Sequence, residues 1–206
     1  MADGNTMLRV KKIIESDPER RYVVVSAPGK RFGGDTKITD LLYETFESVK
    51  LTGKPGAAFG KVAERFRGIV HELALDMDID ALLKKTEREI VKEGTADFVA
   101  SRGEYLSGCV MAALLGIPFI DARDVVKFNA EGRLDSDRTY SLLAEALRGK
   151  PRAVVAGFYG EDAEGRVKTF SRGGSDVSGA IVARAAGAEL YENWTDVSGF
   201  LACDPR

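Results

Sequence analysis

Three short apolar runs constrain the fold more than any other feature of the sequence. They are residues 22–26 in YVVVSAPG, residues 117–122 (IPFIDA) and residues 153–160 (AVVAGFYG). Short apolar runs rich in β-branched side chains are typical of strands buried on both faces, as in a parallel sheet. Helical patterns separate the three runs. The order of elements therefore predicts an α/β protein, a three-layer α/β/α sandwich around an open, mainly parallel sheet.

Apolar residues at helical spacing mark the segments between these strands. The clearest pattern covers 38–49, where apolar side chains recur at i, i+3, i+4 and i+7. Further helices are expected over 8–14, 59–73, 79–90, 103–115, 138–147 and 175–186. A β-hairpin should turn near Glu164 and Gly165, and a last strand should run through Leu190 and Trp194.

Composition narrows the class of protein. The chain has 206 residues, 44% of them apolar, which is enough to bury one sizeable core in a single domain. A net charge of −2 gives no basic surface for nucleic acid or anionic lipid. Cys109 and Cys203 form no CxxC pair, which argues against structural zinc and fits a reducing cytoplasm. The sequence has no membrane span of roughly 18 apolar residues and no signal-peptide pattern.

Familiar nucleotide-binding and hydrolase motifs are missing. Gly29 and Gly34 have the spacing of the two P-loop glycines, but Asp35 and Thr36 stand where Lys and Ser or Thr are required. Neither GxGxxG nor GxSxG occurs, and His71, the only histidine, falls in a helical pattern where a structural or surface role is expected. A bound metal would therefore rely on carboxylates or phosphate oxygens.

The stretch FSRGGSDVSG, residues 170–179, combines a cation, two glycines and an acid at the start of a helix. Paired glycines let the backbone approach a ligand, and the free N–H groups at a helix start attract anions. Arg172 adds a planar fork for a carboxylate or phosphate. Asp176 would repel such a ligand unless it orients a lysine, holds a metal or caps the helix. The plainer reading, that Ser175 or Asp176 is only an N-cap, leaves Arg172 and both glycines unexplained.

A second polar stretch, WTDVSGFLACDPR, follows the last expected strand. Thr195 and Asp196 should emerge at the carboxyl edge of the sheet, and Arg206 adds another fixed cation. Together with the SAPG loop, these segments converge on one crevice with several anion-binding elements. Such a crevice suits phosphoryl transfer, which depends mainly on positioning and charge neutralisation.

The strings VVVSAPG, ITDLL, SRGEYLS, GFYG, RGGSDVSGAIVARAAGAE and WTDVSGFLACDPR, in this order, resemble the aspartate kinases of the amino-acid kinase superfamily. The resemblance covers essentially the whole chain. It implies the fold of that superfamily and the phosphorylation of the side-chain carboxylate of L-aspartate by ATP, with Mg²⁺ held mainly by the nucleotide phosphates. This reaction begins the biosynthesis of lysine, threonine and methionine. The full-length protein is expected to be a cytoplasmic homo-oligomer without a nucleic-acid or membrane partner.

The resemblance assigns the aspartate site to Ser26, Thr39, Glu104, Arg172 and Ser175. Glu104 would accept hydrogen bonds from the substrate ammonium, and Arg172 would grip the substrate carboxylate. Plainer roles stay open, since Ser26 could end a strand, Thr39 could start a helix and Glu104 could favour a helix N-terminus.

For catalysis and the nucleotide, the resemblance points to the two glycine-rich loops and the C-terminal stretch. Asp176 would organise a catalytic lysine, beside Arg172 as a second catalytic residue. Leu201 departs from the family pattern, because many members carry a tyrosine near the adenine. The expected contacts to ATP are Gly157, Gly173, Gly174, Thr195, Asp196, Leu201, Asp204 and Arg206.

Both ends of the chain depart from the family pattern. Members begin with a strand that runs into Lys-Phe-Gly-Gly, whose lysine neutralises the transferring phosphoryl group, and this chain has no such motif. It stops at Asp-Pro-Arg, before the rest of the nucleotide-binding half and the ACT regulatory domains. We therefore expect residues 1–206 to form part of a catalytic domain, weakly active or inactive alone. The alternatives are a catalytically silent fragment and a kinase of the superfamily that acts on glutamate, acetylglutamate or a nucleoside monophosphate.

Overall fold

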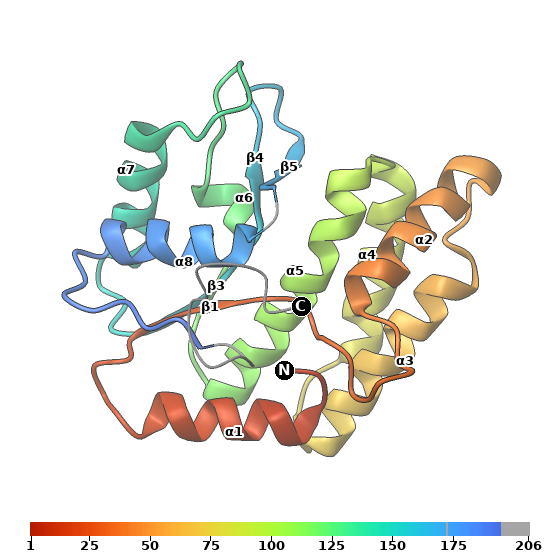
Figure 1. Ribbon diagram of the computed structural model, residues 1–206, viewed down its shortest axis with the longest axis horizontal. Coiled ribbons are helices and arrows are strands. Elements are labelled where there is room, and N and C mark those ends of the chain that lie inside the picture. Colours follow the sequence, from red (N-terminus) through yellow and green to blue (C-terminus); the bar gives the residue numbers. More distant parts are fainter. Residues whose placement is uncertain (172, 195–206) are drawn as a thin grey trace.

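The computed structural model describes residues 1–171 and 173–194, which contain both helices and strands as expected for an α/β protein (Figure 1). The elements in chain order are α1 (Gly4–Glu15), β1 (Tyr22–Val25), α2 (Ile38–Thr52), α3 (Gly56–Glu72), α4 (Ile79–Glu93), α5 (Ala96–Leu115), β2 (Phe119–Ile120), α6 (Ala122–Val125), α7 (Ser136–Leu147), β3 (Ala153–Ala156), β4 (Tyr159–Glu161), β5 (Val167–Thr169) and α8 (Gly174–Ala185).

The central sheet has the strand order β1-β3-β2, and both of its strand pairs are parallel. Val25 lies opposite Ala156, and Phe119 lies opposite Val154. All four residues of β3 are buried, as expected for a strand covered on both faces. β4 and β5 form a separate antiparallel hairpin. The mainly parallel sheet predicted from the three apolar runs is confirmed.

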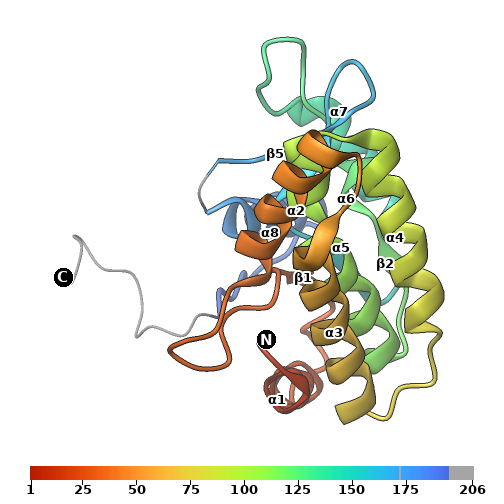
Figure 2. The ribbon, with the colours of Figure 1, turned by 90° about the vertical axis from the view of Figure 1, so that its right-hand side faces the viewer.

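Helices cover both faces of this sheet. β1 lies between α8 and α5 (Figure 2), and α5 contacts all three strands of the sheet. α2 and α4 pack against α5, α3 packs against α2 and α4, and α7 packs against α8. The result is the expected three-layer sandwich with additional helices on the α5 side. No helix in the described part of the chain is long and apolar enough to cross a membrane.

The helices form where apolar residues recur at helical spacing, and α2 shows why. Ile38, Leu41, Leu42 and Thr45 are all buried on the face that packs against α3 and α5. Burial of each large aliphatic side chain stabilises the fold by roughly 1.5–3 kcal/mol. The helix ends at Gly53, whose φ of 71° is the left-handed conformation that glycine adopts most easily.

The helix expected over 103–115 begins earlier than the sequence pattern indicates. α5 starts at Ala96, with the Thr95 side chain accepting a hydrogen bond from the Phe98 N–H at 3.2 Å. Its first turns carry polar residues that are buried, among them Ser101 and Arg102. A helix surrounded by protein on nearly all sides has no polar face. Its sequence therefore lacks the periodic alternation of apolar and polar residues that marks an amphipathic helix.

The run AVVAGFYG forms two strands rather than the single strand expected. β3 ends at Ala156, and Phe158 then takes a φ of 78°, a left-handed conformation that breaks an extended strand. The chain turns at this point and continues as β4, which pairs with β5 instead of the central sheet.

The strand expected through Leu190 and Trp194 is also wrong, because residues 188–194 contain no strand. Side-chain contacts hold this segment instead. Glu192 forms an ion pair with Arg20 at 2.6 Å, and the Arg20 guanidinium lies 5.5 Å from the centre of the Trp194 ring. Leu190 is 74% exposed, so the apolar pattern here does not reflect burial in a sheet.

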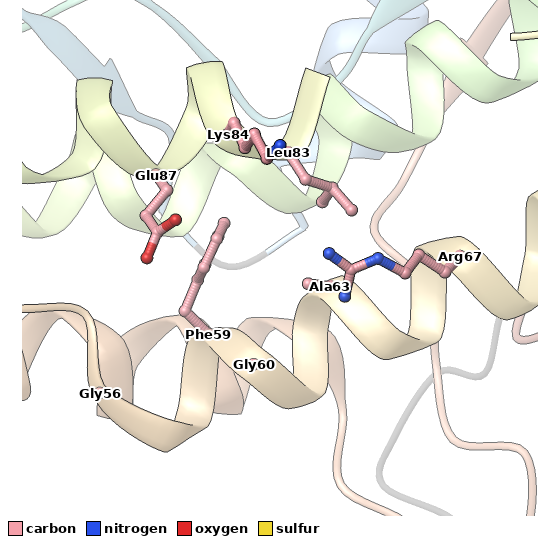
Figure 3. Close-up of a pocket in the computed structure, with 8 residues that line it drawn as sticks. All are labelled: Gly56, Phe59, Gly60, Ala63, Arg67, Leu83, Lys84 and Glu87. Carbon is pink, nitrogen blue, oxygen red and sulfur yellow. The ribbon is translucent and has the colours of Figure 1, made fainter. Parts of the chain in front are cut away.

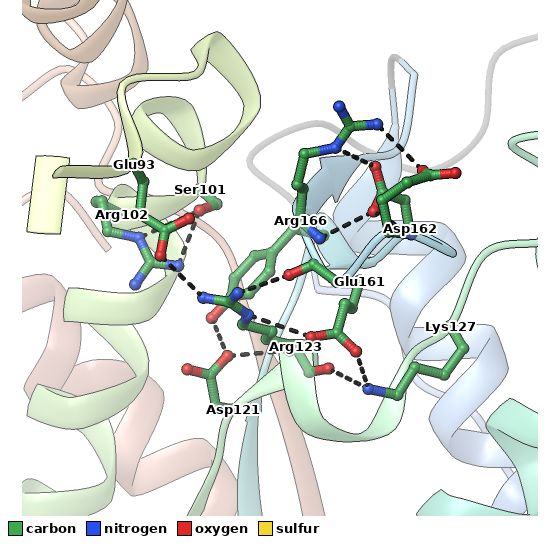
Figure 4. A network of polar contacts seen from close by, with 12 residues as sticks. Glu93, Ser101, Arg102, Asp121, Arg123, Lys127, Glu161, Asp162 and Arg166 are labelled. Carbon is green, nitrogen blue, oxygen red and sulfur yellow. Dashed lines mark hydrogen bonds and ion pairs between the residues drawn. The ribbon is translucent and has the colours of Figure 1, made fainter.

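A polar network ties the hairpin to neighbouring helices (Figure 4). Glu161 on β4 forms an ion pair with Lys127 at 2.6 Å and lies 3.4 Å from Arg123, which also lies 3.5 Å from Glu93 of α4. Lys127 is buried, and the paired carboxylate offsets the cost of removing its charge from water. The network fixes the hairpin whose second strand leads toward the start of α8.

Candidate active site

The carboxyl ends of β1 and β3 meet at the N-terminus of α8. The Gly157 N–H, just after β3, donates a hydrogen bond to the Val25 carbonyl oxygen at 3.0 Å. A Cβ atom at Gly157 would lie 2.8 Å from that oxygen and 3.1 Å from Cβ of Ser175. Only glycine permits this approach, which brings Ser26, Gly157 and Ser175 to one edge of the sheet.

Glu104 reaches the same edge from α5. Its side chain is buried, and Oε1 accepts a hydrogen bond from the Ala27 N–H at 3.1 Å. Oε2 is also buried and has no hydrogen-bond partner in the described part of the chain. Gly103 allows the close packing, because a Cβ atom there would lie 2.7 Å from Cβ of Ala27. A buried carboxylate oxygen without a donor is costly unless a ligand supplies the missing hydrogen bond.

Burial also changes the protonation of this carboxyl group. It raises the pKa of Glu104 to about 7, although hydrogen bonds from main-chain N–H groups and the nearby charge of Arg102 act in the opposite direction. Near neutral pH the group therefore exists in both protonation states. A cationic ligand beside Oε2 would shift it to the ionised state.

Thr39 lies in the first turn of α2, at the far end of the loop that follows β1. The two ends of this loop are close, because the Ile38 N–H donates to the Pro28 carbonyl oxygen at 3.4 Å. Lys37 is the N-cap of α2 and supplies no side-chain hydrogen bond to the first N–H groups of the helix. Thr39 is half-buried, and it makes no side-chain hydrogen bond with another predicted site residue of the described chain.

The first turn of α8 is built on the two glycines. Gly173 is the N-cap with a φ of 78°, and Gly174 is buried against two phenylalanine side chains. The interpretation of Ser175 or Asp176 as the N-cap is therefore wrong, since both lie inside the helix and the N-cap is a glycine, which has no side chain. Asp176 is exposed, and its carboxylate has no hydrogen-bond or ion-pair partner among the described residues. It is available to a group that comes from outside this part of the chain.

Ser178 is a residue of this region that the sequence pattern does not reveal. Its Oγ accepts a hydrogen bond from the Phe158 N–H at 2.9 Å and donates one to the Gly174 carbonyl oxygen at 2.8 Å. It thereby joins the GFYG turn to the first turn of α8. No motif marks this serine, because only the fold brings the two turns together.

Several predicted contacts lie outside the described residues. The structure thus describes the strand-edge part of the predicted site and leaves most of the nucleotide contacts as predictions. Among the residues described, no group of three His, Cys, Asp or Glu side chains could hold a metal ion. The predicted residues outside the described part are Arg172, Thr195, Asp196, Leu201, Asp204 and Arg206, and Cys203 lies there as well.

A groove between α3 and α4 is separate from this site (Figure 3). Phe59 and Arg67 of α3 line it together with Leu83 and Glu87 of α4. None of the predicted site residues that the structure describes lines this groove. The strand edge with Glu104 is therefore the better candidate for an active site.

Comparison with known proteins places this geometry in a family. The model of the amino acid kinase family matches residues 1–206. The chain belongs to the amino acid kinase family. It is 34% identical to aspartokinase 3 of Bacillus subtilis (strain 168), over 100% of this chain and 48% of that protein. It is 29% identical to the lysine-sensitive aspartokinase 3 of Escherichia coli (strain K12), over 100% of this chain and 49% of that protein. The chain thus spans about half the length of these curated relatives.

Solved structures of the family share the fold. The aspartate kinase of Clostridium acetobutylicum is 48% identical, with a TM-score of 0.93 over 100% of this chain and 47% of that chain. Aspartokinase III of E. coli, in complex with aspartate and ADP, is 26% identical, with a TM-score of 0.78 over 96% of this chain and 47% of that chain. The amino-acid kinase fold expected from the sequence motifs is confirmed.

Proposed function

We propose that this chain provides the aspartate-binding part of an aspartate kinase. The reaction transfers the γ-phosphoryl group of ATP to the side-chain carboxylate of L-aspartate and yields 4-phospho-L-aspartate and ADP. Two kinds of observation support the proposal: the named activities of the similar proteins, one of which was solved with aspartate and ADP, and the geometry around Glu104. The observation that carries it is the buried Oε2 atom of Glu104, which has no donor.

An amino-acid substrate supplies the donor that Glu104 lacks. A primary ammonium group beside Oε2 would satisfy the orphaned acceptor and compensate the buried charge with one charge-assisted contact. The Ala27 N–H holds the other carboxylate oxygen, so the acceptor is already oriented before the substrate binds. Binding energy is then not spent on ordering the side chain.

The remaining residues at the strand edge would orient the rest of the substrate. Ser26 follows β1 and Ser175 lies in the first turn of α8, where their hydroxyl groups can donate to a carboxylate. Thr39 stands at the N-terminus of α2, where uncapped N–H groups favour an anion. Arg172 would bind the α-carboxylate with a bidentate fork.

Asp176 would act on the chemical step through a lysine. Its exposed carboxylate can hold a lysine ammonium at the start of α8, and a lysine oriented in this way would neutralise the phosphoryl group in transit. Mg²⁺ would be carried mainly by the nucleotide phosphates, where it offsets their charge.

The same geometry discriminates against other substrates of this superfamily. N-acetylglutamate carries a neutral amide where aspartate carries an ammonium group, so it would leave the charge of Glu104 uncompensated. A nucleoside monophosphate would bring a second negative charge toward it. Glutamate keeps the ammonium group, and only its longer side chain distinguishes it.

A coupled assay of ADP formation tests this function with L-aspartate, L-glutamate and N-acetyl-L-glutamate as acceptors. This assay and the kinetic tests below use the protein extended to the length of its curated relatives, because residues 1–206 are expected to be weakly active or inactive alone. We expect turnover with aspartate, a much lower kcat/KM with glutamate and none with N-acetylglutamate. Equal or higher kcat/KM with either competing acceptor would overturn the assignment.

We also infer a place for the protein in the cell. A role in lysine, threonine and methionine biosynthesis follows from this reaction, and the lysine sensitivity named for the E. coli relative supports it. We propose that the full-length protein is a cytoplasmic homo-oligomer. Fractionation and light scattering of the purified protein test these two properties.

A further inference from the structure

The loop between β1 and α2 carries a predicted substrate hydroxyl at each end. Ser26 precedes it, Thr39 follows it, and the contact between Ile38 and Pro28 closes its base. The loop itself has little apolar anchoring, because Lys30 and the four residues after it are all exposed. Pro28 and Ile38 at its two ends are buried, so polar contacts are left to position the exposed part between them.

One arginine from α3 supplies polar contacts to the loop from outside it. Arg65 is 6% exposed, and its Nη1 donates to the Gly29 carbonyl oxygen at 3.1 Å and to the Ala2 carbonyl oxygen at 3.3 Å. Its Nη2 forms an ion pair with Asp35 at 2.6 Å. Arg65 thus binds the loop near both its beginning and its end, with a planar fork that a lysine cannot reproduce.

Asp35 binds two arginines, Arg65 of α3 and Arg31 of the loop itself. Arg31 also binds it, through its main-chain N–H at 2.9 Å and through its guanidinium at 2.9 Å and 3.0 Å. Hydrogen bonds from Arg31, and then the charge of Arg65, hold the pKa of Asp35 well below its usual range. The two arginines differ in one respect, since the Arg31 side chain is 42% exposed and the Arg65 side chain 5%.

We propose that Arg65 is a positioning residue for the aspartate subsite, holding the loop so that Ser26 and Thr39 face the substrate. The inference rests on the proposed function and names a residue on a helix that contributes no predicted substrate contact. Removing the buried partner of an ion pair leaves Asp35 without its innermost partner and frees the loop. Small displacements of orienting groups have large effects on binding and rate.

Arg65→Gln tests this inference, with Arg31→Gln as the matched control. Both variants remove an arginine that binds Asp35, but only the first removes the buried contacts to Gly29 and Ala2. We expect Arg65→Gln to raise KM for aspartate about tenfold, with KM for ATP within about twofold and kcat within about threefold of wild type. Arg31→Gln should leave all three within about twofold.

Amide hydrogen exchange over residues 29–37 gives a readout that does not depend on turnover. Exchange should be faster in Arg65→Gln than in Arg31→Gln, and saturating aspartate should slow it in the wild type. Asp35→Asn, which keeps the shape of the loop, provides a second variant with the same expected rise in KM if Arg65→Gln does not fold.

The outcomes separate this inference from the proposed function. Equal effects of Arg65→Gln and Arg31→Gln, or equal rises in KM for aspartate and ATP, would overturn the positioning role in an active enzyme. If the wild type forms no ADP with aspartate, the proposed function falls. In that case, equal amide exchange over residues 29–37 in the two variants would also overturn the role of Arg65. Faster exchange in Arg65→Gln alone would keep Arg65 as the residue that holds the loop in place.

Discussion

Glu104 and Ala27 are joined by a hydrogen bond of 3.1 Å from the main-chain N–H of Ala27 to Oε1 of Glu104. The contact links the buried helix α5 to the loop after β1 and leaves Oε2 as an unsatisfied acceptor. A protein tolerates such an atom when function requires it. The predictions below follow from this arrangement and from the first turn of α8.

Replacing Glu104 by glutamine should weaken aspartate binding selectively. Glu104→Gln keeps the shape of the side chain and removes its charge, so KM for aspartate should rise about a hundredfold or more, as for loss of one partner of a buried ion pair. KM for ATP should change little. Steady-state kinetics beside Glu44→Gln, an exposed glutamate of α2, checks the prediction. Comparable rises in KM for both substrates would count against an ammonium contact.

Replacing Asp176 by asparagine should impair the chemical step. This substitution changes the charge without removing a helix cap, because the N-cap of α8 is Gly173 and not Asp176. With folding intact, kcat should fall by about two orders of magnitude, as expected for losing a preorganised electrostatic element. A kcat within about threefold of wild type, less than about 0.7 kcal/mol, would remove Asp176 from the catalytic residues.

Replacing Arg172 by lysine should affect KM for aspartate and KM for ATP differently. A point charge cannot reproduce a bidentate grip on the α-carboxylate, so Arg172→Lys should raise KM for aspartate far more than KM for ATP. Initial-rate measurements with each substrate varied in turn provide the check. If both KM values rise in parallel, the carboxylate contact is assigned to the wrong residue.

Adding a methyl group at Gly174 should destabilise the first turn of α8. Its Cβ would lie 2.8 Å from Cδ2 of Phe158 and 2.8 Å from Cβ of Phe170. Gly174→Ala should therefore lower the free energy of unfolding by about 1–3 kcal/mol. Gly68→Ala in α3 is the control, because a Cβ there meets open space and should stabilise the helix by roughly 0.5–1 kcal/mol. Urea unfolding of both variants tests the pair, and equal effects would contradict the packing account.

The sequence predicts the fold well wherever a pattern has one physical cause. The spacing of Leu41, Leu42 and Thr45 predicts α2 because one face of that helix is buried. α5 starts earlier than predicted because its buried face is nearly the whole helix, including Arg102. The break at Phe158 was not predictable, since no local rule favours a left-handed phenylalanine.

The sequence predicts the charged and glycine-rich motifs of the candidate site but not the main-chain contacts that position them. The carboxyl ends of β1 and β3 converge as the topology rule requires, which brings Ser26 beside Gly157. The hydrogen bonds of the Ala27 N–H and the Ser178 hydroxyl join residues that are far apart in the sequence, so only the folded chain reveals them. Arg65 is 30 positions from its Asp35 partner, and no motif connects the two.

The proton that Glu104 loses on binding aspartate is the most direct test of the account. Burial raises the pKa of this carboxyl to about 7, so both the protonated and the ionised form are present near neutral pH. The substrate ammonium requires the ionised form, and its binding should expel that proton.

Isothermal titration calorimetry of aspartate binding in buffers of different ionisation enthalpy measures the proton count. We predict net release of protons on aspartate binding at pH 7, declining toward zero as the pH rises to about 9, where Glu104 is already ionised. Glu104→Gln should release none. No proton release from the wild type at pH 7, or equal release from wild type and Glu104→Gln, would contradict the assignment of Glu104 as the acceptor for the substrate ammonium.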